Sequence, residues 1–325
     1  MRTFLAALSL LALVSMTLVS MTLVSMTLVS GSVFAQSSWE SANGPYPGFI
    51  YSQVVDQSGN LFVGTGGRGI FVADKSDENT WHERNSGLNT TAVYTIAVTS
   101  SGTLLAGTDE GIYRSEDSGN NWNPSNNGLS STFINTIVVS PRGTIFVATG
   151  GGGIFRSADN GENWEQVNSG LDALVTLSIA IDGDGIVFVG TDGSGVFRSM
   201  DNGDSWNRVN EGLLNTAVLS LAVDAAGTVY AGTRGGGVFR SGNRGDEWSR
   251  TNHALQTRSV YSLVCDQSRN LYAGTEAGVF VSSTQGETWS AMNVGLTNPI
   301  VLSLAVDTES QLAAGTGGAG VFRTR

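Results

Sequence analysis

The stretch SADNGENW, from Ser157 to Trp164, decides how the rest of this chain is interpreted. The same pattern returns as SEDSGNNW, residues 115–122, and as SMDNGDSW, residues 199–206. Looser copies are SGNRGDEW, residues 241–248, and SSTQGETW, residues 282–289. Each copy follows a short apolar run and precedes a polar segment, so the stretch marks a unit that the chain repeats.

The residue types of this stretch predict a tight turn between two strands. The carboxylate of Asp159 can accept hydrogen bonds from the amides that follow it, as in an Asx turn. Gly161 supplies the positive φ that residues with a Cβ avoid, and Trp164 is expected to begin the next strand. Residues repeated at every period usually serve the repeat, so we interpret them as structural. In the three full copies these residues are Ser115, Asp117, Gly119, Trp122, Ser157, Asp159, Gly161, Trp164, Ser199, Asp201, Gly203 and Trp206.

Two markers measure the period of the repeat. The seven tryptophans, from Trp39 to Trp289, follow one another at intervals of 41 or 42 residues. A Gly-Thr pair (Ala-Thr in one unit) recurs at a similar interval from Gly64 to Thr316. A period of about 42 residues fits four short strands per unit. The first strands of the units are expected near residues 50–56, 93–99, 134–140, 176–182, 218–224, 260–266 and 301–307.

Composition agrees with short strands joined by turns, because the 325 residues include 43 glycines and only 14% are charged. The last unit stops after its third strand, VFRTR, where a turn and a tryptophan strand should follow. A tryptophan strand without a unit of its own stands instead near the start, at Trp39. We therefore expect the N- and C-terminal strands to share one unit, which would close the repeats into a ring without free sheet edges.

The S-x-D-x-G-x-x-W pattern resembles the Asp-box, or BNR repeat, of β-propellers. The resemblance covers residues 37–325, and the whole is similar to photosystem II stability/assembly factors, sortilin-type receptor rings and xyloglucanase-type propellers. It implies an all-β fold, a seven-bladed propeller of four-stranded antiparallel blades. In that family the box is a turn remote from the face that binds ligands.

Residues 1–35 differ from the rest of the sequence. They carry one charge, Arg2, and an apolar run with MTLVS three times in tandem. Small residues at the end of this run predict a signal peptide cleaved after Ala35, leaving residues 36–325 as a single propeller that is secreted or periplasmic and does not contact the membrane. The alternative is an uncleaved segment that anchors the chain in a membrane.

Charge and residue types exclude several kinds of partner. The net charge of −11 argues against nucleic acid. His82 and His253 stand in separate repeats, and no Gly-rich turn is followed by a helix, so we expect no metal and no other cofactor. Cys265 is the only cysteine, and its place in an apolar run predicts a buried, inert thiol. We expect the protein to be a monomer.

Candidate functional residues are those that break the repeat on the face away from the boxes. The turns after the Gly-Thr marker and the loops that lead into the next unit vary most. The charged candidates are Arg68, Asp109, Asp172, Asp192, Arg234, His253, Arg258 and Glu276. The same loops also carry the aromatic residues Tyr46, Phe49 and Phe133.

The resemblance implies a non-catalytic docking ring for a protein or peptide, although the residues leave enzymatic activity open. The alternative is a glycan-active protein, either a lectin or a glycoside hydrolase of sialidase or xyloglucanase type. The Arg-Ile-Pro motif of sialidases does not occur, and the xyloglucanase type pairs two rings around a cleft. Lectin propellers repeat their sugar site with the blades, whereas the charged and aromatic candidates of this sequence do not recur with the period.

Overall fold

The innermost strand of each repeat is a six-residue run rich in Val, Ile, Leu and Ala, a composition that favours buried strands. In the computed structural model, the described residues are 38–46, 48–255, 257, 259–307 and 309–324. The innermost strands are β2 (Ile50–Val55), β6 (Val93–Val98), β10 (Ile134–Val139), β14 (Thr176–Ile181), β18 (Val218–Val223), β22 (Val260–Cys265) and β26 (Val301–Val306).

The second and third strands of each repeat follow outward from the first. The second strands are β3 (Leu61–Thr65), β7 (Leu104–Thr108), β11 (Ile145–Thr149), β15 (Val187–Thr191), β19 (Val229–Thr233), β23 (Leu271–Thr275) and β27 (Leu312–Thr316). The third strands are β4 (Ile70–Asp74), β8 (Ile112–Ser115), β12 (Ile154–Ser157), β16 (Val196–Ser199), β20 (Gly237–Ser241), β24 (Gly278–Ser282) and β28 (Val321–Thr324).

The fourth, outermost strands are short in most repeats. They are β5 (Asp77–Glu83), β9 (Asn123–Pro124), β13 (Glu165–Gln166), β17 (Asn207–Arg208), β21 (Ser249–Arg250), β25 (Ser290–Ala291) and β1 (Trp39–Ser41). The described residues thus form seven four-stranded antiparallel sheets and no helix. We number the sheets as blades 1 to 6, from β2–β5 to β22–β25, and blade 7 consists of β26, β27, β28 and β1.

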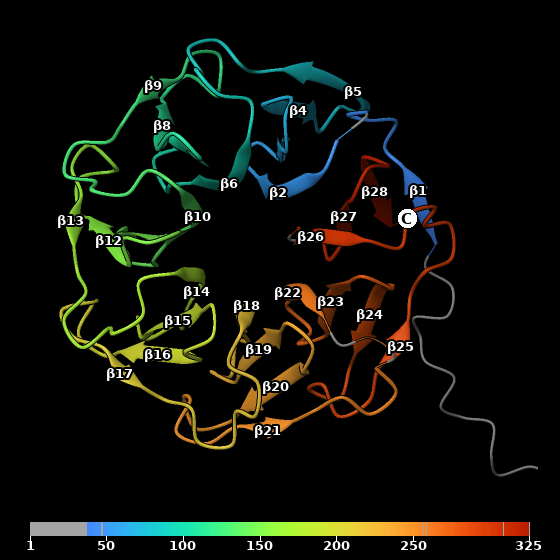
Figure 1. Ribbon diagram of the computed structural model, residues 1–325. Helices are drawn as coiled ribbons and strands as arrows, with labels where there is room; N and C mark the ends of the chain where they lie inside the picture. The colour runs from blue at the N-terminus through green and yellow to red at the C-terminus, as the bar shows by residue number, and fades with distance from the viewer. Residues whose placement is uncertain (1–37, 47, 256, 258, 308, 325) are drawn as a thin grey trace, which may run out of the picture. The chain divides into compact units, whose positions relative to one another are not determined.

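The seven blades form a closed ring, which confirms the expected propeller. The innermost strands surround the centre (Figure 1), and each contacts the innermost strands of both neighbouring blades, β26 with β2 included. In blade 7, β1 pairs with β28, and Glu40 lies opposite Arg323. The two ends of the described chain therefore complete one sheet, as the sequence predicted. The apolar core lies between adjacent blades, for example where Phe62 of blade 1 packs with Trp122 of blade 2.

Tryptophan side chains link every blade to the blade before it. The indole N–H of Trp164 donates to the carbonyl of Ser125 (2.8 Å), and the indole of Trp81 in blade 1 donates to the carbonyl of Ala42 in blade 7 (2.8 Å). The remaining tryptophans that make the same kind of bond are Trp39, Trp122, Trp206, Trp248 and Trp289. A buried indole N–H needs an acceptor, and here the acceptor is always on the preceding blade.

One prediction about these tryptophans was wrong. Trp164 does not begin the fourth strand, since β13 starts at Glu165. The pairing of β13 with β12 begins at Glu165, opposite Arg156, while the main-chain N–H of Trp164 donates to the carbonyl of Asn127 in the preceding blade (2.9 Å). The tryptophan is a contact between blades as much as a part of its sheet.

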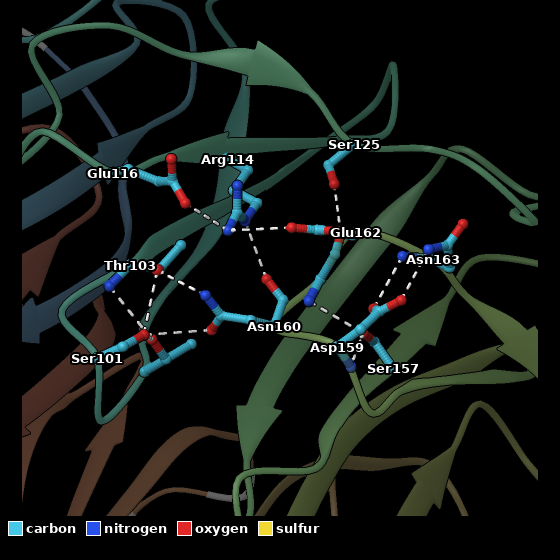
Figure 2. A network of polar contacts seen from close by, with 12 residues as sticks. Ser101, Thr103, Arg114, Glu116, Ser125, Ser157, Asp159, Asn160, Glu162 and Asn163 are labelled. Carbon is cyan, nitrogen blue, oxygen red and sulfur yellow. Dashed lines mark hydrogen bonds and ion pairs between the residues drawn. The ribbon is translucent and has the colours of Figure 1, made fainter.

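The turn between the third and fourth strands of blades 2 to 6 is called the box turn here, and it comprises residues 115–122, 157–164, 199–206, 241–248 and 282–289. In blade 3, Ser157 Oγ donates to Asp159 Oδ1 (2.8 Å) and accepts from the Gly161 amide (2.9 Å). Asp159 Oδ1 also accepts from the Asn163 amide (2.9 Å), as Figure 2 shows. Gly161 has a φ of +85°, a conformation that glycine adopts without strain.

The looser copies keep the same turn with a different acceptor. Asn243 Oδ1 accepts from the Glu247 amide (3.0 Å), and Thr284 Oγ1 accepts from the Thr288 amide (2.9 Å). Blade 1 has no box turn, because β4 and β5 continue into a hairpin in which Asp74 lies opposite Asp77.

Candidate functional site

Two faces of the ring follow from the alternating strand directions. The box turns and the turns between first and second strands lie on one face, the box face, where Asn160 Nδ2 of a box turn donates to Thr103 Oγ1 of the neighbouring blade (2.7 Å). The turns between second and third strands, and the segments that lead into the first strands, lie on the other face. We call this second face the loop face, and the charged candidate residues were predicted from its turns and loops.

The structure brings two of the sequence-predicted residues together. Arg234 Nη1 lies 3.0 Å from Asp192 Oδ1, so the turns of blades 4 and 5 are joined by an ion pair. Asp172 pairs instead with Arg208 (2.6 Å) of the following blade. These pairs are largely exposed, and ion pairs of this kind contribute about 0–1 kcal/mol each.

The other candidates have local partners. Arg68 lies 3.3 Å from Glu83, and Asp109 accepts a hydrogen bond from the Thr90 hydroxyl (2.8 Å). Glu276 accepts from the Ser259 amide (3.3 Å). The exposed His253 accepts a hydrogen bond at its main-chain carbonyl from the Trp289 amide (3.1 Å), and Arg258 lies outside the described residues. The charged candidates are thus spread over several blades and do not converge on one point.

Aromatic rings do converge on the loop face. Phe49 and Tyr51 of blade 1 are stacked, with ring centroids 6.1 Å apart and planes within 8°. Tyr94 of blade 2 follows at 5.5 Å from Tyr51, and Phe133 of blade 3 follows at 4.9 Å from Tyr94. We call these four residues the aromatic row. Phe49 and Phe133, at its two ends, are 48% and 42% exposed, which is unusual for phenylalanine in a soluble protein.

Glycines on the loop face leave room for this row. A Cβ added to Gly66 would lie 2.6 Å from a ring carbon of Tyr51, and one added to Gly150 would lie 2.9 Å from a ring carbon of Phe133. Both glycines directly follow the Gly-Thr or Ala-Thr marker. The rings therefore lie over glycine main chain at a position where four of the other blades carry an Asp, Arg or Glu side chain.

Sequence reasoning found Phe49 and Phe133 but missed Tyr51 and Tyr94. Both tyrosines are the second residue of an innermost strand, a position whose side chain faces the central channel together with its counterparts in the other blades. The signal was present in the sequence as variation, because the residues at this position are Tyr51, Tyr94, Asn135, Leu177, Leu219, Tyr261 and Leu302. The apolar character of the whole strand hid it.

One charged group acts on the aromatic row. Burial raises the pKa of Tyr94, and the negative charge of Asp109 raises it further. The guanidinium of Arg68 contacts residues outside the row, because it lies 5.1 Å from the ring centroid of Phe71 and donates to the carbonyl of Tyr46. Beneath the row, the central channel has a volume of about 290 Å³.

Other reactive groups give no competing site in the described part of the chain. It holds no cluster of three His, Cys, Asp or Glu side chains placed to bind a metal ion. Cys265 is half-buried, and burial followed by the charges of Asp224 and Asp266 raises its pKa to about 12, which makes the thiol a poor nucleophile. No helix of the described residues is long and apolar enough to cross a membrane.

Solved structures similar to this chain share its ring. The extracellular domain of a protein described as a one-component system of B. thetaiotaomicron is 20% identical, with a TM-score of 0.75, and the match covers 90% of this chain and 40% of that one. This chain therefore spans about two fifths of the length of that extracellular domain. The GH74 xyloglucanase of Xanthomonas campestris is 17% identical (TM-score 0.69), with 88% of this chain and 53% of that chain covered.

A third similar structure is YCF48 bound to D1 peptide, which is 16% identical (TM-score 0.70), with 88% of this chain and 96% of that chain covered. Identities this low show a shared fold only. Among curated proteins no relative of this chain is found. A family model, the DUF6242 β-propeller domain, matches residues 36–174, 118–213 and 175–301, which together are most of the sequence. The chain is therefore a member of the DUF6242 β-propeller domain family.

Proposed function

We propose that this chain is an exported, non-catalytic binding propeller that docks a peptide or protein segment on its loop face. The observation that carries the proposal is the aromatic row, which presents four rings from three neighbouring blades at the mouth of the central channel. Aromatic side chains dominate the energetics of protein interfaces, because they bury a large area with few rotatable bonds.

The row spans three blades, which favours an extended peptide over a single sugar ring. Phe49 and Tyr51 are stacked, and the two pairs that follow are tilted by 30° and 35°, so the four rings form one continuous apolar surface. A peptide segment can place side chains along this surface and reach Asp109, whose charge acts on Tyr94. A ring of the same fold, YCF48, is described as bound to a peptide, and other similar rings are extracellular domains. These likenesses support docking and export of this chain as proposals.

We also infer that the box turns are Asp-box repeats and that residues 1–35 are a signal peptide cleaved after Ala35. The inference on the box turns is supported by the hydrogen bonds that Ser157 and Asp159 make within one turn. N-terminal sequencing of the exported protein tests the cleavage site. A mature chain that begins at residue 36 is expected, and a chain that retains its first residues in a membrane fraction would contradict it.

The docking proposal is tested with a peptide selected from a displayed random library on the wild-type protein. Phe133→Ala and Tyr94→Ala each remove a ring from the row, and we expect each to weaken binding of that peptide at least about tenfold, as for an interface hot spot. Leu214→Ala is the matched control, because Leu214 is an exposed apolar residue (83%) elsewhere in the ring and its loss should leave binding unchanged. Fluorescence anisotropy of the labelled peptide measures the affinities.

The alternative is a glycan-active protein, and variants of two loop-face carboxylates test it. The similar GH74 xyloglucanase is a glycan hydrolase by description, and it is the reason to include glycans. A glycan array and a panel of chromogenic glycosides are used with the wild type, Asp109→Asn and Asp192→Asn. If the wild type hydrolyses a glycoside and either substitution abolishes this activity, the protein is a glycoside hydrolase and the docking proposal is wrong. Glycan binding without turnover, combined with no selected peptide, would indicate a lectin.

A further inference from the structure

Where a blade has a box turn, the turn fills the space against the preceding blade on the box face. The carbonyl of Asn160 in blade 3 accepts a hydrogen bond from Arg114 Nε in blade 2 (3.0 Å), which Figure 2 shows beside the contact of Asn160 with Thr103. Gly161 lies against Leu105, because a Cβ added to the glycine would be 3.0 Å from Leu105 Cδ2. One box turn thus makes two contacts with the preceding blade. A turn carbonyl accepts a hydrogen bond from an arginine, and a turn glycine lies against a large apolar side chain.

The same contacts recur at other blade boundaries. The arginine of the third strand donates to the carbonyl at the fourth position of the next box turn in three further pairs, Arg156 with Asn202, Arg198 with Arg244 and Arg240 with Gln285. Opposite these arginines in the sheet register, the second strand carries a large side chain. Including blade 2, these side chains are Leu105, Phe146, Phe188 and Tyr230.

The boundary between blades 7 and 1 lacks two of these parts. Blade 1 has a hairpin in place of the box turn, with Asp74 opposite Asp77. Blade 7 keeps an arginine, Arg323, but its partner on the second strand is Ala313. The missing turn and the missing large side chain coincide, and a cavity of about 470 Å³ lies at this boundary. We call it the seam pocket.

The lining of the seam pocket is apolar inside and charged at its edge. The apolar residues include Val55, Leu61, Leu312 and Ala313, and the charged residues are Asp56, Lys75, Asp307, Glu309 and Arg323. Lys75 Nζ lies 3.6 Å from Glu309 Oε1 and joins the two blades by an exposed ion pair. The volume is within the range of about 300–1,000 Å³ that is usual for ligand pockets.

We propose that the seam pocket binds a turn-forming peptide segment of a partner protein that presents one large apolar side chain. The occupant is inferred from what fills the corresponding space between other blades, a tight turn together with a Leu, Phe or Tyr side chain. Arg323 occupies the same register position in blade 7 as Arg114 does in blade 2, where the arginine donates to the carbonyl of a turn. Arg323 also lines the seam pocket. The site lies on the box face, so it is separate from the proposed docking on the loop face.

Charge adds a second requirement on the partner. Three carboxylates, those of Asp56, Asp307 and Glu309, line the pocket together with two cationic side chains. This excess of negative charge belongs to a chain that is itself acidic, with a net charge of −11. A segment with a basic residue next to its apolar anchor is therefore the favoured partner, and its association weakens as salt screens these charges.

A probe can be designed from the chain's own box turn. It is a fluorescein-labelled cyclic peptide with the sequence of residues 241–248, whose Arg244 supplies the basic residue, and D-phenylalanine replaces the residue at Gly245. A D-residue suits the φ of +91° at this position. Its ring is meant to enter the space beside Ala313, which Phe188 fills at the same register position in blade 4. The comparison peptide carries D-alanine at the same position. We expect the D-phenylalanine peptide to bind at least tenfold more tightly in fluorescence anisotropy.

Two variants fill the pocket without changing its edge. Ala313→Phe and Ala313→Leu restore the side chains that blades 3 and 2 carry at this register position, and both are expected to lower the affinity of the D-phenylalanine peptide at least tenfold. Thermal melts identify which of the two folds like the wild type, so one variant remains if the larger side chain is not accommodated. Gly183→Ala, which adds a methyl group in open space on the turn between β14 and β15, is the matched control and should leave binding unchanged.

Three outcomes would overturn the proposal. The first is that the two peptides bind wild type equally or not at all. The second is that a folded Ala313 variant binds the D-phenylalanine peptide as tightly as wild type does. The third is that anilinonaphthalene sulfonate binds to the wild type but not to Ala313→Leu, while neither peptide binds to the wild type. That result would make the seam pocket a site for small amphipathic molecules.

Discussion

Asp201 holds its box turn together as an ionised carboxylate. It accepts hydrogen bonds from the Ser205 hydroxyl, the Ser205 amide (2.9 Å) and the Ser199 hydroxyl (2.7 Å). The Ser205 hydroxyl is the largest cause that lowers the pKa of Asp201 to about 2. The pKa of Asp159 is also lowered to about 2, because hydrogen bonds from Asn163 and Ser157 outweigh the effect of burial. The pKa of Asp117 is also lowered, mainly by the hydrogen bonds that its carboxylate accepts from Asn121.

These shifts predict an acid-sensitive contribution to stability. A carboxyl whose pKa is lower in the folded chain than the usual value of about 3.9 stabilises the fold above pH 4 and loses that contribution as pH falls to 2. We expect the variant with Asp117→Asn, Asp159→Asn and Asp201→Asn to melt below the wild type at pH 7 and to approach it between pH 4 and pH 2. Circular dichroism melts across this pH range measure the difference.

Blade 5 provides the reason to expect this variant to fold, since Asn243 already accepts the corresponding amide hydrogen bond (3.0 Å). A difference in melting temperature between variant and wild type that stayed constant from pH 7 to pH 2 would show that the ionised state of these three residues does not stabilise the ring.

At the scale of the element, the fourth strands owe their position to the neighbouring blade more than to their own sheet. The loop after β13 contains Gly170, whose φ is +82° and whose added Cβ would lie 2.3 Å from the carbonyl oxygen of Trp206. The same approach to a tryptophan carbonyl is made by Gly87, Gly128, Gly212 and Gly295. This contact explains the Gly-Leu pair that follows most box turns in the sequence.

Gly170→Ala is expected to destabilise the protein by about 1–3 kcal/mol from backbone strain alone, and by more if the main chain of Trp206 cannot move. Gly151→Ala is the matched control, because Gly151 has open space around it and no positive φ. Urea unfolding compares the two variants with the wild type. Equal midpoints for all three proteins would mean that the loop relaxes freely and that this contact does not hold β17 in place.

The sequence allowed the ring of seven four-stranded blades to be predicted, because the apolar runs, the Gly-Thr marker and the tryptophans repeat with one period. The start of the fourth strand was predicted wrongly at Trp164, since a tryptophan bonded to another blade looks like a strand residue in the sequence. Tyr51 and Tyr94 were missed as members of the aromatic row for a related reason. The central channel forms only where the seven innermost strands meet. The sequence of one buried strand therefore does not show which of its side chains face the channel.

At the scale of the whole molecule, the ring was predictable and its irregular boundary was not. The number of tryptophans and the unfinished last repeat together implied a shared blade. The seam pocket depends on Ala313 and the β4–β5 hairpin lying side by side, although they are more than 200 residues apart in the sequence. Neither feature is unusual alone, and only closure of the ring brings them together.

Closure predicts that damage at either end destabilises the whole ring. Deleting residues 320–325 removes β28, and deleting residues 37–42 removes β1 with the bond from the Trp39 amide to the carbonyl of Val294 (2.8 Å) in blade 6. Each deletion exposes a sheet edge. The N-terminal deletion also removes Trp39 and Ala42, and with them two of the indole hydrogen bonds that link the blades. We expect a single melting transition at a clearly lower temperature for both, measured by calorimetry. A deletion that left the thermal midpoint unchanged would contradict closure by the terminal strands.

The shared blade also fixes an order of events in time. The ribosome makes β1 before β26 to β28, so β1 has no partner in its sheet until the strands of the six intervening blades have been synthesised. Blades 1 to 6 each have all four strands in one continuous segment and can assemble as they emerge. Blade 7 cannot, and so the circle is completed only when β28 becomes available to pair with β1.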